Sequence, residues 1–152
     1  FSGLIKPRVK IHGEMFVGEV VEVGTEVTDF EVNDMVYGTN GMKLGAYAEY
    51  VAVDVKEAIK KVPKDLDYKD VLPLIDGGIT ALPFLKKAGN IKAGDSVLIN
   101  GASGAVGSMA VMIAKHFKAE VTGVCSTGNV EKVKLLGADY VIDYKKEDFT
   151  VN

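Results

Sequence analysis

The sequence has little cysteine and proline, and each shortage excludes a class of protein. Its 152 residues include one cysteine, Cys125, so neither a disulfide framework nor a multi-cysteine zinc site can form within the chain. The 4 prolines, set against 17 scattered glycines, exclude a collagen-like repeat. With 47% hydrophobic and 26% charged residues, the chain is instead typical of a globular protein that buries its own core.

Charge and hydrophobic runs are also limited. The 18 basic and 21 acidic residues give a formal charge of -3, which predicts no general affinity for nucleic acid or an anionic membrane. The longest apolar stretch, around residues 105–114, is too short to cross a bilayer. No secretory signal is visible, which predicts a cytoplasmic protein. The chain begins at Phe1, within what reads as ordinary folded sequence, and we interpret this start as a cut.

The first part of the chain predicts antiparallel strands. Between residues 13 and 53, β-branched and aromatic residues recur at period two between turn formers, which predicts strands over 16–23, 34–37 and 46–53. Val17, Val21 and Val23 suit a first strand that is largely buried on both faces.

Beyond Pro63 the pattern becomes helical and then alternates. Residues 66–88 predict two short helices with a break near Asp76, because prolines and the Gly77-Gly78 pair interrupt the run. Further on, the order is strand, helix, strand, helix, strand. The strands are expected over 96–100, 120–124 and 140–143, with helices carrying Val106 to Phe117 and residues 130–136. Such alternation predicts a parallel sheet with right-handed crossovers.

A glycine-rich loop joins the first of these strands to its helix. It consists of Gly101, Ala102, Ser103, Gly104, Ala105, Val106 and Gly107. Gly101 allows a sharp turn, Gly104 leaves no side chain where phosphates would approach the backbone, and Gly107 lets the helix pack closely on the strand. The free amides and the dipole of the helix can then bind a diphosphate. We therefore predict a dinucleotide site, with the Ser103 hydroxyl as a further donor.

Two alternatives bear on this loop. The spacing G-x-x-G-x-x-G differs from the commoner G-x-G-x-x-G, and a tight turn that binds nothing remains open. The position between an apolar strand and an amphipathic helix favours dinucleotide binding. A P-loop is excluded, because no Gly-Lys-Ser/Thr follows at the required distance.

The residues after the second strand favour NADP(H) over NAD(H). NAD sites usually place an acid there to hold the ribose 2′-hydroxyl, and here the first acid is Glu131. Ser126, Thr127 and Asn129 can instead donate hydrogen bonds to a 2′-phosphate. The alternative is a polar loop with no preference.

Several motifs in order resemble one family. They are GEVVEVG (18–24), FEVNDMVYG (30–38), GAYAEYV (45–51), GGITAL (77–82), VLINGASGAVG (97–107), AEVTGVCST (119–127), LLGADYVIDY (135–144) and EDF (147–149). Together they resemble the zinc-free medium-chain dehydrogenase/reductase family, in its quinone oxidoreductase-like branch. The resemblance covers nearly the whole chain.

The resemblance implies an α/β fold with two parts. These are a partial GroES-like β domain (1–65), followed by joining helices and the first half of a Rossmann cofactor-binding domain, a doubly wound parallel sheet (66–152). It places Thr80 near the nicotinamide and phosphate end, and Tyr144 near the 2′-phosphate. Many relatives carry a basic residue where this chain has Gly128, and Lys132 could replace it if its helix turns it inward.

The resemblance also implies an activity. Zinc-dependent relatives have Gly-His-Glu where this chain has Gly13-Glu14-Met15, and His12 is one position out of register, on the expected surface. The expected reaction is therefore zinc-free hydride transfer from NADPH to a small quinone or α,β-unsaturated carbonyl substrate. We expect this chain to be a truncated piece of a longer, homo-oligomeric enzyme and assign no catalytic residue. A non-catalytic NADPH-binding or structural module is the alternative.

Overall fold

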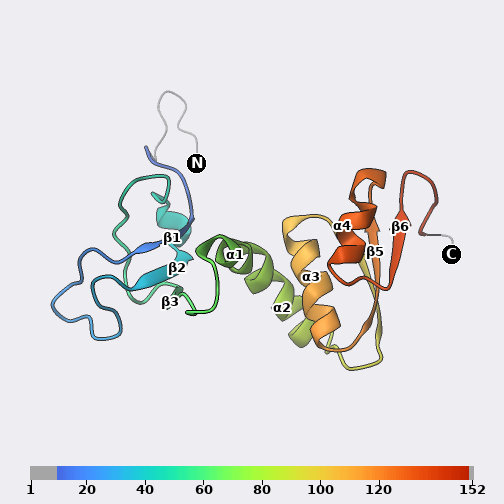
Figure 1. Cartoon of the computed structure of the whole chain (residues 1–152), viewed down its shortest axis with the longest axis horizontal. Coiled ribbons are helices and arrows are strands. Elements are labelled where there is room, and N and C mark those ends of the chain that lie inside the picture. Colours follow the sequence, from blue (N-terminus) through green and yellow to red (C-terminus); the bar gives the residue numbers. More distant parts are fainter. Residues whose placement is uncertain (1–9, 151–152) are drawn as a thin grey trace. The chain divides into compact units, whose positions relative to one another are not determined.

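The computed structural model describes residues 10–150. Within them the chain forms two compact units, Phe1–Ile75 and Asp76–Asn152, and each is considered by itself (Figure 1). The predicted domain division at 65/66 stays a prediction, and the expected cut before Phe1 lies outside the described residues. Within residues 10–150, no helix combines the length and apolar character that a bilayer crossing requires.

The first unit contains a three-stranded antiparallel sheet in the order β1-β2-β3. Strand β1 (Met15–Glu19) pairs with β2 (Met35–Thr39), and β2 pairs with β3 (Ile59–Lys61). Val36 of β2 is buried, as are Val71 and Ile75 in the helical segment that follows β3. The antiparallel prediction is therefore confirmed, although the strands differ from those expected.

Three expectations in this unit are wrong in detail. The first strand ends at Glu19 instead of residue 23, so Val21 is 60% exposed instead of buried. Residues 46–53 form no strand, since a strand needs a partner and their first amides donate instead to the carbonyls of His12 and Gly13. Strand β3 arises in a lysine-rich segment, 56–64, that lies outside the three strands predicted from the sequence.

The helical run between residues 68 and 88 widens where a break was expected. It passes from α1 (Tyr68–Pro73) through a π-helical turn, Leu74–Gly78, to α2 (Ile79–Pro83) and a second π-helical turn, Phe84–Ala88. Each π turn begins directly after a proline. A proline has no N–H to donate and its ring crowds the carbonyl four residues earlier, and a wider turn accommodates both effects. The predicted break near Asp76 is thus a π turn.

The second unit is built on a parallel sheet in the order β4-β5-β6. Strands β4 (Ser96–Asn100) and β6 (Tyr140–Asp143) have the predicted bounds, and β5 (Glu120–Cys125) is one residue longer than predicted. Helices α3 (Ala105–His116) and α4 (Val130–Leu135) connect them (Figure 1). The expected α/β class, with an antiparallel sheet followed by a Rossmann-type parallel sheet, is confirmed.

Close packing of α4 on the sheet explains a small residue in β5. A Cβ added at Gly123 would lie 2.6 Å from Cγ1 of Val133 and 3.1 Å from Cβ of Ala102. Val121 and Cys125, which point to the same side of β5, are fully buried, as is Val111 on α3. The two helices and this side of the sheet therefore form the core of the second unit.

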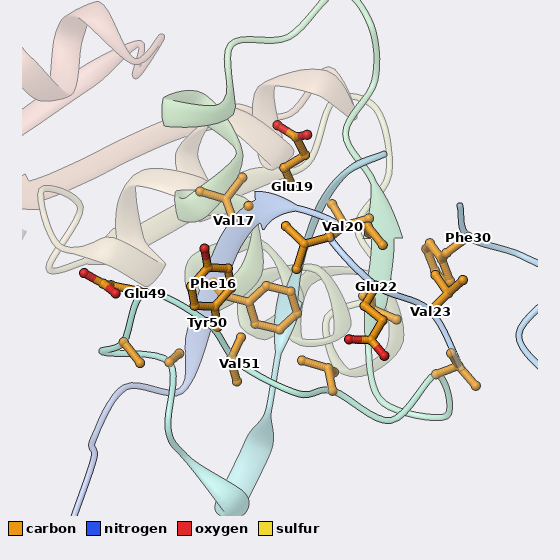
Figure 2. Close-up of a pocket in the computed structure, with 18 of the residues that line it drawn as sticks. Phe16, Val17, Glu19, Val20, Glu22, Val23, Phe30, Glu49, Tyr50 and Val51 are labelled. Carbon is orange, nitrogen blue, oxygen red and sulfur yellow. The ribbon is translucent and has the colours of Figure 1, made fainter. Parts of the chain in front are cut away.

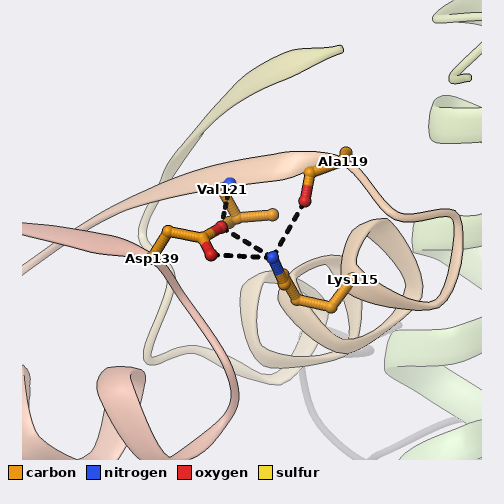
Figure 3. A network of polar contacts seen from close by, with 4 residues as sticks. All are labelled: Lys115, Ala119, Val121 and Asp139. Carbon is orange, nitrogen blue, oxygen red and sulfur yellow. Dashed lines mark hydrogen bonds and ion pairs between the residues drawn. The ribbon is translucent and has the colours of Figure 1, made fainter. Parts of the chain in front are cut away.

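A polar network also joins the far ends of these elements (Figure 3). The ammonium of Lys115, near the end of α3, lies 2.7 and 2.8 Å from the two carboxylate oxygens of Asp139 and donates to the carbonyl of Ala119. The same carboxylate accepts the N–H of Val121 at 2.7 Å. These bonds, and chiefly the Lys115 hydrogen bond, lower the pKa of Asp139. The network therefore connects the turn before β6 to the start of β5 and to the end of α3.

Candidate nucleotide-binding site

The carboxyl edge of the parallel sheet collects the residues that the sequence singled out. We use this term for the ends of β4, β5 and β6, at Asn100, Cys125 and Asp143, and for the segments that follow them. In an open α/β sheet, ligands bind at this edge, because successive loops converge there. The glycine loop follows β4, Ser126 and Thr127 follow β5, and Tyr144 follows β6.

The glycine loop is held in place by the neighbouring strand. Gly101 has a φ of +76°, a left-handed conformation that favours glycine, and its N–H and that of Ala102 both donate to the carbonyl of Val124. A Cβ at Gly107 would collide with the carbonyl of Gly101 and lie 2.9 Å from Cα of Ala102. Gly101 and Gly107 are thus required by the turn and by the packing of α3 on it.

Gly104 differs from these two glycines because its surroundings are open. It precedes the first turn of α3 with extended backbone angles, and the nearest atom to an added Cβ is the carbonyl oxygen of Gly101 at 3.4 Å. No side chain caps the helix at this point, and its first turn contains no acidic residue. The amides there are consequently available to an anion, which is the condition a diphosphate requires.

Thr80 lies on α2, which packs against α3. The two helical segments approach closely near the loop, since a Cβ at Gly77 would lie 2.5 Å from the carbonyl oxygen of Ala105 and 2.6 Å from Cγ of Met109. The Thr80 side chain is exposed. The structure therefore places the helix that carries Thr80 beside the helix that begins at the glycine loop.

The polar residues after β5 contact one another. The Asn129 amide donates to Oγ of Ser126 at 3.0 Å, and the N–H of Asn129 donates to the Ser126 carbonyl at 2.8 Å. Tyr144 directly follows β6, the strand next to β5. Its N–H donates to the carbonyl of Cys125 at 3.1 Å, and its side chain is exposed. The structure thus brings Ser126, Asn129 and Tyr144 to one place, and their role in binding a cofactor stays a prediction.

Thr127 interacts with a residue that sequence reasoning missed. Asp143 ends β6, is 6% exposed, and accepts the N–H of Lys145 at 3.1 Å. The pKa of this carboxylate is lowered, first by the Thr127 side chain; burial acts in the opposite direction, and Lys145 and Lys146 lower it further. The sequence did contain a signal for Asp143, namely an acidic residue as the last residue of an apolar strand, at the carboxyl edge of the sheet.

Lys132 is turned toward the glycine loop. Its ammonium donates to the carbonyl of Ser103 at 3.1 Å, which links the start of α4 to the loop. The sequence left open whether α4 would turn this lysine inward. The structure answers that it does, and so places a cation between the glycine loop and the segment after β5.

Cys125 is a core residue, since it is 1% exposed. Burial, with a smaller effect of Asp143, raises the pKa of its thiol. His12 is exposed. Among residues 10–150, no three His, Cys, Asp or Glu side chains are grouped as a metal site would require.

The first unit contains a separate hollow of about 850 Å³ (Figure 2). Its wall is mainly apolar and comes from β1, the segment after it and residues 46–55, with Phe16, Val20 and Val51 among the lining side chains. The carboxylates of Glu19, Glu22 and Glu49 are its charged groups. None of the predicted cofactor residues lines it.

Comparison with known proteins decides the family. Residues 3–64 match the model of the alcohol dehydrogenase GroES-like domain, and residues 105–151 match that of the zinc-binding dehydrogenase. The quinone oxidoreductase of Coxiella burnetii superposes with a TM-score of 0.83 at 35% identity, covering 92% of this chain and 44% of that one. The chain belongs to the medium-chain dehydrogenase/reductase family.

Two further proteins that this chain is similar to are a reductase and a quinone oxidoreductase. The 2-methylene-furan-3-one reductase of Solanum lycopersicum is 38% identical over 98% of this chain and 40% of its own length. The quinone oxidoreductase of Escherichia coli, solved in complex with NADPH, has a TM-score of 0.81 at 26% identity and covers 90% of this chain and 42% of that one. The chain thus spans about 40% of the length of the relatives it matches. The predicted quinone oxidoreductase-like resemblance is confirmed.

Proposed function

We propose that this chain binds NADPH and serves hydride transfer to a quinone or an α,β-unsaturated carbonyl, without zinc. The observation that carries the proposal is the glycine loop between β4 and α3, with open space at Gly104 and an uncapped, acid-free first turn of α3. The names of the matched relatives, a furanone reductase and quinone oxidoreductases, support the substrate class. The NADPH-bound relative supports the cofactor.

The residues at the carboxyl edge suit the cofactor. The amides of Ala105, Val106 and Gly107 would hold the diphosphate, with Ser103 beside them, and Ser126, Asn129 and Tyr144 would surround the adenosine ribose. Thr80 would lie toward the nicotinamide. The bound nicotinamide supplies the hydride, and the chain's own contribution is to fix its position relative to the acceptor.

The zinc-free part of the proposal depends on residue identity. Glu14 occupies the position where zinc-dependent relatives carry a ligand histidine, and it accepts a hydrogen bond from the Thr39 hydroxyl at 3.3 Å. A carboxylate engaged with a neighbouring strand is a poor substitute for the neutral imidazole of a catalytic zinc site. Homo-oligomerisation and a cytoplasmic location stay predictions.

The test is cofactor binding and oxidation by the full chain. NADPH is titrated by fluorescence, and its oxidation is then followed with a panel of quinones and enones. Binding together with turnover supports the oxidoreductase. Tight binding without turnover across the panel would favour the non-catalytic NADPH-binding module, and absence of binding to either NADPH or NADH would refute the proposal as a whole.

A further inference from the structure

Lys132 differs from the three ion-paired lysines of the second unit in what it faces. Lys134, on the same helix, forms an ion pair with Glu131 at 3.0 Å. The ammonium of Lys146 lies 3.7 Å from the Asp143 carboxylate, and that of Lys115 binds Asp139. Lys132 instead donates to the neutral carbonyl of Ser103, and among the described residues no carboxylate lies within ion-pair distance of it. Its charge is therefore not compensated by the protein.

The position of Lys132 is where a ribose phosphate would lie. Its hydrogen bond to the Ser103 carbonyl joins α4 to the glycine loop. Helix α4 follows the polar residues after β5, which include Ser126. In a dinucleotide fold the adenosine ribose lies between these two segments. An ammonium that spans them can exchange a carbonyl partner for a phosphate oxygen without a change of backbone.

The hydroxyl and amide groups expected to recognise a 2′-phosphate are already engaged. The side-chain amide of Asn129 donates to Oγ of Ser126 at 3.0 Å. A neutral donor also serves a ribose hydroxyl nearly as well as a phosphate, whereas a lysine ammonium strongly favours the doubly charged group. These neighbours therefore explain binding of the ribose better than selection between NADPH and NADH.

We propose that Lys132 determines the preference of this chain for a nucleotide with a 2′-phosphate, by transferring its ammonium from the Ser103 carbonyl to that phosphate. The inference rests on the proposed NADPH function and assigns its selectivity to one residue of α4. Ser126, Asn129 and Tyr144 then hold and orient the ribose, and Lys132 supplies the charge that distinguishes the two cofactors.

The experiment compares Lys132→Gln with Lys134→Gln in the full chain. The control removes a charge from the same short helix, where the lost partner is Glu131 instead of the loop. NADPH and NADH are titrated with each variant by fluorescence, and 2′-AMP and 5′-AMP are titrated as fragments. Lys132→Arg tests whether charge alone suffices, and urea unfolding checks that each variant is folded.

The expected result is selective. Lys132→Gln weakens NADPH roughly tenfold or more, as expected for the loss of one charge-assisted hydrogen bond, and leaves NADH within about twofold. It weakens 2′-AMP in the same proportion but not 5′-AMP, and Lys132→Arg retains most of the affinity for NADPH. Lys134→Gln changes none of these values. Lys132→Gln should be the one variant of the set whose NADPH affinity falls less steeply with added salt.

Three outcomes would overturn the inference. Equal weakening of NADPH and NADH by Lys132→Gln would place the ammonium on the shared diphosphate. Unchanged affinity for both would show that the ammonium stays with the loop. A wild-type chain that binds both cofactors equally would have no preference to explain. In each case binding itself survives, whereas a wild-type chain that binds neither cofactor would refute the proposed function as well.

Discussion

Gly104→Ala separates nucleotide binding from folding, because the structure gives this glycine no role in packing. The backbone at Gly104, with φ of -77° and ψ of 173°, is extended and available to any residue. The added Cβ would meet only the carbonyl oxygen of Gly101, at the ordinary contact distance of 3.4 Å. The free energy of unfolding should therefore change by no more than about 0.5 kcal/mol.

The same methyl group should weaken binding strongly. It would occupy the space through which a diphosphate approaches the amides of α3. Loss of one hydrogen bond to a charged group costs about 1.5–3 kcal/mol, which corresponds to roughly 10- to 100-fold weaker binding of NADPH. NADH should be weakened in the same proportion, because both cofactors carry the diphosphate.

The assay pairs a fluorescence titration of NADPH with urea unfolding of each variant. Gly18→Ala is the matched control, since its added Cβ meets no atom within 4 Å and the residue lies outside the carboxyl edge. Gly107→Ala provides the opposite comparison, and should lose stability together with binding because its Cβ collides with Gly101. If Gly104→Ala bound NADPH as tightly as the wild type while remaining folded, the assignment of the loop to the diphosphate would be refuted.

Three further predictions concern the second unit. Gly123→Ala should destabilise the chain by about 1–3 kcal/mol in urea unfolding, because its Cβ would lie 2.6 Å from Val133, and unchanged stability would contradict the packing described. Lys115 first, and the N–H of Val121 next, lower the pKa of Asp139 in the folded chain, so its contribution to stability is complete above the unfolded pKa and is lost as the pH falls through the lower folded value. Asp139→Asn should therefore flatten the decline of stability in acid, and superimposable acid curves would argue against the network. Cys125, whose thiol pKa is raised mainly by burial, should react with a thiol reagent in urea but not in the folded chain at about pH 8, and rapid modification of the folded chain would show that it is accessible.

The sequence was most informative where structure depends on neighbours along the chain. The bounds of β4 and β6, the helix after the glycine loop and the parallel order of the strands follow from local periodicity and from glycine at turns. The glycine loop was found in the same way. Where the outcome depends on a distant partner, the same reasoning failed. Residues 46–53 have the period of a strand, but no strand pairs with them among the described residues, whereas Ile59–Lys61 pairs with β2 despite its lysines.

Amino-acid order by itself determined the βαβ framework, the family and the position of the glycine loop, because each depends on residues that follow one another closely. Tertiary structure alone decided which polar groups meet at the carboxyl edge. It turned Lys132 toward Ser103, joined Asn129 to Ser126 and paired Lys115 with Asp139. Such contacts join segments that are separated in the chain, and their formation depends on how helices pack on the sheet, which no local pattern encodes.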